Sequence, residues 1–207
     1  MPRAKQRTPE LRDRVLQVAV EMLATDGVAG LTTRKVAAKA ATSTPAVYEL
    51  FGDKAGLVRG MFVEGFRMLR RRLERLPETD EPRADVERVI QTLRTFVRAH
   101  PALAELMFSR PFHDFDPGAA WAEAGAAARV FIVARIQRCI DAGVLAGDAT
   151  DVAHVLFSLA QGLAATEAAG WLGTSKASVD RRWQLGIRAV LNGLSPPAPR
   201  RSRPARR

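Results

Sequence analysis

The sequence predicts an all-α protein of about nine helices, and three observations support this fold class. Apolar residues recur at intervals of three and four along most of the chain, as on one face of an amphipathic helix. No segment alternates apolar and polar residues over a useful length, so strands are not expected. The 207 residues are 47% hydrophobic and 26% charged, a balance typical of a folded protein with one large domain or two small ones.

The first helix carries an apolar stripe that begins at Leu11 and runs to Leu23. Gly27 is expected to end it, because glycine takes the left-handed backbone that closes many helices. Thr32 then stands as an N-cap before a short helix over residues 33–40.

A third helix follows, with Ser43 as its cap and Pro45 in its first turn, where a missing N–H costs nothing. It is expected to stop at Gly52. Asp53 is placed to cap a fourth helix that continues to about Leu76, just before a proline.

The rest of the chain begins with an acidic linker at residues 78–82 and ends with a proline- and arginine-rich tail that cannot bury a core and is expected to be disordered. Helical patterns between them cover residues 83–100, 101–110, 117–143, 149–171 and 175–193.

Two short helices joined by a tight turn and braced by a longer helix form a helix-turn-helix. Small Ala37 and Ala40 are expected to let the short helices cross closely, with Val36, Val47 and Phe51 filling the space between them. The free face of the second short helix then suits the major groove of DNA.

The net charge of +10 is unevenly distributed. Residues 1–60 carry 10 Lys/Arg against 6 Asp/Glu, residues 61–194 carry 17 against 16, and residues 195–207 carry 5 Arg and no acid. Basic ends around a neutral body favour a nucleic-acid module attached to an uncharged second domain. A second interpretation stays open, because 27 Arg against 5 Lys also fits coding bias.

One cluster of arginines falls on the predicted fourth helix. A solvated helix face and an auxiliary phosphate contact are both compatible with it. Its members are Arg67, Arg70, Arg71, Arg72 and Arg75.

Several classes of protein are disfavoured. The single cysteine, Cys139, is expected to be a small buried residue, and alone it makes neither a disulfide nor a zinc cage. No apolar run reaches the roughly 20 residues that span a bilayer, and the N-terminus lacks the apolar core of a secretory signal. We therefore expect a cytoplasmic protein.

Catalytic and metal-binding patterns are also weak. His100, His113 and His154 are not spaced as a metal pair, and there is no phosphate-binding glycine loop. Residues 113–116 are interpreted as a loop turn, and the acids of 148–154 as favourable charges at a helix N-terminus. No metal, cofactor or catalytic site is expected, and an all-α enzyme is the least favoured interpretation.

The segment from Gly30 to Leu57 resembles the DNA-binding domain of TetR-family transcriptional regulators. The resemblance rests on the capped threonine, on Tyr48 in the recognition helix and on Phe51-x-x-Lys54-x-x-Leu57, and it extends over residues 11–60. Where the family usually has glycine in the turn, this chain has Ala41. A left-handed backbone there would cost about 1 kcal/mol.

The resemblance implies contacts with the DNA backbone and with the bases. Phosphate contacts are implied for Thr33, Tyr48 and Lys54. Base-edge contacts are implied for Arg34, Thr44, Pro45 and Ala46. Ser43, the cap of the recognition helix, is also placed among the DNA-binding residues.

Three of these implications carry alternatives. Glu49 either accepts a hydrogen bond from cytosine or faces water, and Tyr48 is otherwise a half-buried packing residue. The arm of Arg3, Lys5 and Arg7 either enters a minor groove or follows phosphates.

Residues 83–194 resemble the C-terminal domain of TetR regulators of the WHG type, through residues 96–108 and 159–163. The resemblance implies a small, mainly apolar effector bound between helices. The alternative is that the same large residues are ordinary core. The pocket candidates are Phe96, Met107, Phe108, Phe112, Trp121, Phe131, Phe157 and Gln161.

The last two helices are expected to form the interface of a homodimer, because a palindromic operator is bound by a dimer with two-fold symmetry. The interface candidates are Leu156, Leu159, Leu163, Glu167, Val179, Trp183, Ile187 and Val190.

The resemblance thus implies an arm and DNA-binding domain in residues 1–54, an effector and dimerisation domain in residues 55–194, and a basic tail in residues 195–207. The expected function is that of a repressor that the effector releases from DNA by changing the tilt of the fourth helix. The alternative is a helical ligand-binding module with weak or lost DNA binding.

Overall fold

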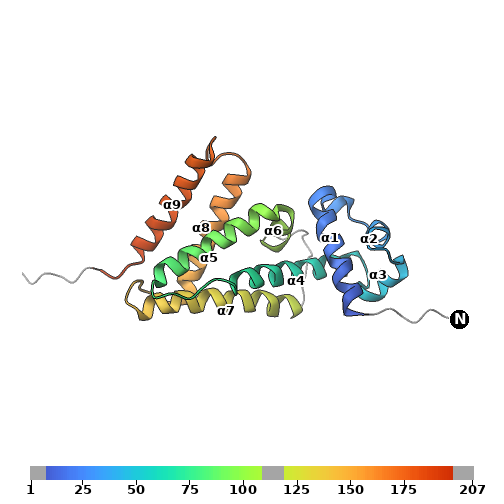
Figure 1. The fold of residues 1–207 in the computed structure, drawn as a ribbon, viewed down its shortest axis with the longest axis horizontal. Coiled ribbons are helices and arrows are strands. Elements are labelled where there is room, and N and C mark those ends of the chain that lie inside the picture. Colours follow the sequence, from blue (N-terminus) through green and yellow to red (C-terminus); the bar gives the residue numbers. More distant parts are fainter. Residues whose placement is uncertain (1–7, 109–118, 198–207) are drawn as a thin grey trace, which may run out of the picture. The chain divides into compact units, whose positions relative to one another are not determined.

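Every regular element in the part of the chain described by the computed structural model, residues 8–108 and 119–197, is an α-helix. The all-α prediction is confirmed for these residues. The nine helices found there (Figure 1) are α1 (Pro9–Gly30), α2 (Thr33–Lys39), α3 (Thr44–Phe51), α4 (Lys54–Leu73), α5 (Pro82–Ala99), α6 (Pro101–Phe108), α7 (Ala119–Asp141), α8 (Ala149–Ala168) and α9 (Lys176–Gly193).

The helices belong to two compact units. Unit 1 contains the chain up to Arg75 together with Thr92–Phe131, and unit 2 contains Leu76–Gln91 together with the chain from Ile132 onward. The division predicted after residue 54 concerns the roles of the segments, and it stays a prediction.

Side-chain caps start the second, third and fourth helices as the sequence predicted. The Thr32 hydroxyl accepts from the Lys35 amide at 3.3 Å, and the Ser43 hydroxyl accepts from the Ala46 amide at 3.2 Å. The Asp53 carboxylate accepts from Gly56 N at 2.6 Å. Each cap satisfies a backbone donor that the first turn of a helix leaves without a partner.

Several helix ends differ by one to three residues from the prediction, among them the ends of α1 and α4. Gly27 is non-helical, with φ 66°, but the hydrogen-bonded helix resumes beyond it and α1 extends to Gly30. Helix α4 ends at Leu73 instead of Leu76. The proline at position 77 disfavours helical backbone at the residue before it, so the last turn does not form.

The α2–α3 pair packs closely against α1 and α4 within unit 1 (Figure 1). Val36 and Val47 are fully buried, and Ala37 and Ala40 keep 2% and 1% of their surface exposed. The expectation that small alanines permit a close crossing is confirmed. Phe51 is half-buried and also packs against Gly60 of α4, where a Cβ atom would lie 3.0 Å from the phenyl ring.

Unit 2 contains the α8–α9 hairpin. Trp183 of α9 is fully buried, and its indole Nε1 donates to the Glu167 carboxylate of α8 at 2.6 Å. The Ala146 amide donates to the carbonyl of Leu194 at 2.8 Å, which joins the two ends of the hairpin.

A buried charge network lies at the α5 end of unit 2. Asp85, which is 2% exposed, accepts from Thr79 N and Oγ1 at 3.0 and 2.8 Å and from Arg138 Nη1 at 2.9 Å, and it also pairs with Arg88. Burial alone raises the pKa of this carboxyl, but the hydrogen bonds outweigh it and lower the pKa to about 2. The ionised form of Asp85 therefore stabilises the folded unit.

Cys139 is fully buried, in agreement with its expected role as a small core residue, and burial raises the pKa of its thiol. None of the helices in the described ranges combines the length and the apolar character that crossing a bilayer requires.

Candidate nucleic-acid interface

Helices α2 and α3 bring two hydroxyl groups together at the protein surface. Thr33 is the first residue of α2, and its Oγ1 donates to the Tyr48 hydroxyl in the middle of α3 at 3.3 Å. Tyr48 is 48% exposed. The two phosphate-contacting candidates are thus adjacent, and both face solvent at least in part.

The base-reading candidates occupy the first turns of α2 and α3. Arg34 and Pro45 are exposed, whereas Thr44 and Ala46 are half-buried. Ser43 is exposed as well, and its oxygen is already used to cap α3.

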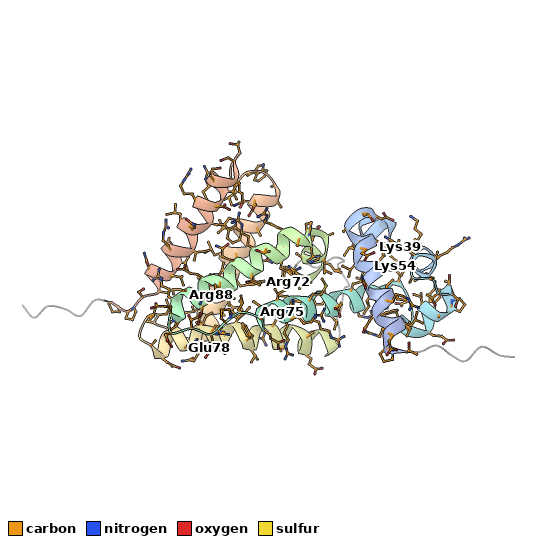
Figure 2. The ribbon with its side chains drawn as sticks, viewed as in Figure 1. Lys39, Lys54, Arg72, Arg75, Glu78 and Arg88 are labelled. Carbon is orange, nitrogen blue, oxygen red and sulfur yellow. The ribbon has the colours of Figure 1, made fainter. Side chains whose placement is uncertain are left out.

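Two more charged candidates lie on α3 and at the start of α4. Glu49 of α3 is exposed. Lys54 is the exposed first residue of α4, and Figure 2 labels it together with Lys39, the last residue of α2. We call the set Thr33, Arg34, Pro45, Tyr48 and Lys54 the reader surface.

In the turn that joins α2 to α3, Ala41 has the left-handed backbone conformation that was considered from the sequence. Ala41 has φ 50°, and among the described residues it is the non-glycine residue with positive φ. The Ala41 and Thr42 amides donate back to α2, to the carbonyls of Ala38 and Ala37 at 3.2 and 2.9 Å. An alanine in this conformation is strained by about 1 kcal/mol.

Two arginines of α1 contact the α2–α3 pair, and sequence reasoning missed both. Arg14 Nε donates to the carbonyl of Ala40 at 3.1 Å, and the Arg12 guanidinium lies 5.4 Å from the centre of the Phe51 ring. The first contact joins residues 26 positions apart, so no local pattern in the sequence signals it.

The N-terminal arm, with Arg3, Lys5 and Arg7, lies outside the described residues. The arginine cluster of α4 is within them, and several members form ion pairs on its surface. Arg71 and Arg67 pair with Glu64 at 2.7 and 4.0 Å. These pairs fit the solvated-face interpretation.

Arg72 of the same cluster makes a different contact. Its Nη2 donates to His100 Nε2 at 2.9 Å, and its guanidinium lies 5.3 Å from the centre of the Phe96 ring. Because a guanidinium has no acceptor, the Nε2 atom of His100 is unprotonated in this contact. Burial, together with the charge of Arg72, lowers the pKa of His100.

The pocket candidates divide between the units. In unit 1, Phe96 is fully buried. Met107 packs closely against Gly65 of α4, since a Cβ atom on that glycine would lie 2.4 Å from the Met107 sulfur. Phe108 meets Phe66 edge to face at 5.9 Å.

The remaining candidates are less defined. Phe131, the last residue of unit 1, and Phe157 and Gln161 of unit 2 are half-buried. Phe112 lies outside the described residues, as does the side chain of Trp121. An effector pocket therefore stays a prediction.

The interface candidates of α8 and α9 differ in exposure. Leu156, Trp183 and Ile187 keep 3% or less of their surface exposed, and Val179 keeps 9%. They are buried within one chain, so they pack its own helices instead of offering a surface to a second copy. The half-buried candidates are Leu159, Leu163, Glu167 and Val190.

At α8, the acids that could suggest a cation site lie at the N-terminus of a helix, as the sequence predicted. Asp148 caps this helix by accepting from the Thr150 and Asp151 amides at 2.8 and 3.1 Å, and His154 Nδ1 lies 2.9 Å from the Thr150 carbonyl. His113 lies outside the described residues. Within the described residues, no three His, Cys, Asp or Glu side chains form a group able to hold a metal ion.

The fold and the reader surface together define a helix-turn-helix protein in which further helices follow the reader along the chain. Comparison with known families agrees. Residues 15–61 match the model for bacterial regulatory proteins of the tetR family, and residues 86–190 match the model for the tetracyclin repressor-like C-terminal domain.

Individual proteins and structures are also similar to the chain. It is 32% identical over 108 residues to the nucleoid occlusion factor SlmA of Aliivibrio fischeri, in a match that covers 50% of this chain and 54% of that protein. The chain therefore spans about half the length of the curated relatives it matches.

Solved structures match over more of the chain. A protein of unknown function from Rhodococcus sp. RHA1 is 29% identical with a TM-score of 0.79, over 92% of this chain and 98% of the other. The transcriptional regulator FadR of Bacillus subtilis, solved in complex with stearoyl-CoA, is 14% identical with a TM-score of 0.71, over 87% and 98%.

The second family model alone spans half of the chain. This protein therefore belongs to the TetR family and is a DNA-binding transcriptional regulator with a helix-turn-helix.

Proposed function

We propose that this regulator is a repressor that binds a palindromic operator as a homodimer and is released by a small, mainly apolar effector. The observation that carries the DNA-binding part is the reader surface. Its two adjacent hydroxyls and its exposed cations face solvent together with the exposed Pro45.

In this proposal the hydroxyls of Thr33 and Tyr48 and the ammonium of Lys54 hold phosphates, which fixes the register of the protein on DNA. The first turns of α2 and α3 then read bases. Arg34 can donate twice to guanine, and Pro45 and Ala46 can contact thymine methyl groups. Thr44 and Ser43 stand beside them, and Glu49 either accepts from cytosine or faces water.

The homodimer is proposed to form through the exposed side of the α8–α9 hairpin. Val155 and Leu185 keep 46% and 60% of their surface exposed. Leu159 lies four residues after Val155, on the same side of α8, and it is close to Gly186 of α9, where a Cβ atom would lie 3.4 Å from its Cδ1. A closely packed helix pair with exposed apolar residues suits a four-helix interface.

The effector is proposed to bind between helices that follow the reader in the chain, with the unit 1 candidates Phe96, Met107 and Phe108 in its lining. The B. subtilis FadR structure supports an apolar ligand in so far as this fold can hold stearoyl-CoA. Effector binding is proposed to change the tilt of α4 and so the spacing of two recognition helices.

The proposal is tested by a gel shift and a footprint on DNA upstream of the gene for this protein and of its neighbours, at two salt concentrations. A protected inverted repeat and an affinity that falls steeply with salt are expected. Effector binding without salt-dependent DNA binding would instead favour the ligand-binding module with lost DNA affinity.

A matched pair of variants sharpens this test. Lys54→Ala should weaken binding to all DNA sequences, because it removes a phosphate contact. Lys176→Ala is the control, because it removes an exposed lysine of α9 that pairs with Asp180, far along the chain from the reader. Equal losses in the two variants would contradict the assignment of Lys54.

A further inference from the structure

We propose that Arg14 of α1 is a positioning residue for DNA reading, which holds the strained α2–α3 turn in the conformation that presents α3 to DNA. This inference rests on the proposed function, because it assumes that α3 reads bases. It adds a residue outside the helix-turn-helix to the machinery of recognition.

The peptide group that Arg14 contacts adjoins the strained residue Ala41. Arg14 Nε donates to the carbonyl of Ala40, and that carbonyl belongs to the peptide that joins Ala40 to Ala41. The orientation of this peptide is set by ψ of Ala40, which is 6°, and by φ of Ala41, which is 50°. Arg14 therefore contacts one of the two peptide groups that define the strained residue.

Ala41 has a driving force to leave this conformation, since an L-alanine with positive φ is strained. Helices α2 and α3 are both packed in unit 1, so a flip of the Ala40–Ala41 peptide is the smallest movement that removes the strain. The flip changes ψ of Ala40 and φ of Ala41 together, and it turns the Ala40 carbonyl away from Arg14. Two hydrogen bonds of this peptide oppose the flip: the one from Arg14 to the Ala40 carbonyl and the longer one, at 3.2 Å, from the Ala41 amide to the Ala38 carbonyl.

The turn sets the direction in which α3 begins. Thr42 and the N-cap Ser43 follow Ala41 directly, and the first turn of α3 contains Thr44, Pro45 and Ala46. A change at Ala41 therefore moves the residues that are proposed to face bases. The far end of α3 is held from the same helix, because Arg12 lies over Phe51.

Arg14 is an exposed residue, so it contributes little to the buried core. Replacing it should leave the helices folded, which circular dichroism of the full chain would verify. The informative variant is Arg14→Lys. It keeps the positive charge, but lysine has a methylene where arginine has Nε.

The test compares this variant in two backgrounds by measuring operator affinity at several salt concentrations. With Ala41 present, Arg14→Lys should weaken binding about tenfold. In a protein that also carries Ala41→Gly, Arg14→Lys should change affinity less than twofold, because glycine takes a positive φ without strain. The slope of log affinity against log salt should be the same in all four proteins.

Each contrary result overturns the inference. An equal loss in both backgrounds would mean that Arg14 does not act through the turn. A slope reduced by about one in Arg14→Gln would identify a direct phosphate contact instead. An unchanged affinity for Arg14→Lys would show that the turn needs no support.

A measurement without DNA separates this inference from the proposed function. Backbone chemical shifts and the HN–Hα coupling of Ala41, measured by NMR on the full-length protein, report its φ. They should change in Arg14→Lys if Arg14 holds the turn, and unchanged values would overturn the inference. If the wild-type protein binds no operator, the proposed function fails, and the NMR result still decides whether Arg14 controls the turn.

Discussion

Tyr48 keeps nearly half of its surface exposed, although tyrosine is a largely apolar residue. Its hydroxyl accepts a hydrogen bond from Thr33, which leaves the phenolic hydrogen available to donate outward. In the proposed function, the pair offers this donor to a phosphate without burying the ring. The packing role of Tyr48 stays the alternative.

We predict that Tyr48→Phe weakens binding to all DNA sequences by about tenfold, because a hydrogen bond to a charged phosphate contributes roughly 1.5–3 kcal/mol. The thermal unfolding curve should hardly change, since the hydroxyl is at the surface. Titration of the operator and of an unrelated duplex by fluorescence anisotropy measures both losses. A loss confined to the operator would contradict a phosphate contact.

Asp85 is one residue through which pH acts on the stability of the protein. Its pKa is about 2 in the folded protein and near 3.8 without these partners. The folded state therefore binds this proton less readily than the unfolded state. The resulting stability, roughly 2 kcal/mol, is present above pH 3.8 and is lost as the pH falls through about 2.

We predict that Asp85→Asn destabilises the protein by at least about 2 kcal/mol at pH 7, because the variant also leaves arginines facing a neutral amide. Urea unfolding at pH 7 and at pH 3 measures the difference in stability between the two proteins. It should narrow at pH 3, because Asp85 of the unfolded wild-type chain, with the higher pKa, takes up a proton there while the folded protein largely does not. The exposed acid Asp13 of α1, replaced by asparagine, serves as the control. If the difference in unfolding free energy between the two proteins did not change with pH, the Asp85 carboxylate would be excluded as its cause.

At the scale of helices, α3 and α4 are joined by a backbone approach that requires glycine. A Cβ atom on Gly56, in the first turn of α4, would lie 1.8 Å from the carbonyl oxygen of Phe51, the last residue of α3. Neither backbone can yield without moving its helix. The position of α3 relative to α4 therefore depends on the absent side chain.

We predict that Gly56→Ala destabilises the protein by roughly 1–3 kcal/mol, as expected for overpacking against rigid atoms. Gly125→Ala in α7 is the control, since a Cβ there meets nothing closer than 3.9 Å. Removing a glycine from a helix interior normally stabilises it. Chemical denaturation of both variants decides, and similar effects at the two sites would refute the steric explanation.

Helices α8 and α9 illustrate how one apolar pattern serves two purposes. Leu156 and Trp183 are buried, and Trp183 bonds to Glu167 across the hairpin, while Val155 and Leu185 remain at its surface. A wide apolar stripe on each helix is consistent with both roles. Only the packing separates the residues that join the helices from those that face outward.

At the scale of the whole molecule, a palindromic operator requires two readers at a fixed separation. We predict that Leu185→Glu shifts the protein from dimer to monomer at micromolar concentration and weakens operator binding by tenfold or more. Sedimentation velocity measures the first effect and a gel shift the second. A full-strength dimer would place the interface elsewhere.

Val130→Glu provides the matched control for this prediction. Val130 is 66% exposed on α7, so the same kind of substitution is made at an exposed apolar residue of another helix. Its dimerisation and operator affinity should stay close to those of the wild-type protein. Equal losses in both variants would indicate a general effect of added charge.

The regulatory proposal also makes a prediction for the whole molecule. If the effector releases the protein from DNA, then saturating operator must weaken effector binding by the same factor, because coupling between two sites is reciprocal. Isothermal titration with and without operator measures both affinities. Effector affinity that is unchanged by operator would refute release by this route.

Local patterns in the sequence were enough to predict the helices and to indicate the family. The all-α prediction is confirmed in the described residues, and Thr32, Ser43 and Asp53 start their helices as expected. These features depend on neighbours within a few positions, through periodicity and caps, so they can be predicted from the sequence. The order of such local features also carried the resemblance to the TetR family.

Contacts between residues far apart in the chain could not be predicted from such patterns and became known from the packing of the helices. Arg14 donates to the carbonyl of Ala40, 26 positions along the chain, and Trp183 donates to Glu167 within the same chain. Position 56 has no room for a side chain because the carbonyl of Phe51 lies where its Cβ atom would be. A contact of this kind depends on how helices pack, and helical periodicity gives the face of each residue but not its neighbour. The helix proposed to read DNA could therefore be predicted from the sequence, whereas the side chains that hold it in place could be identified only from the packing.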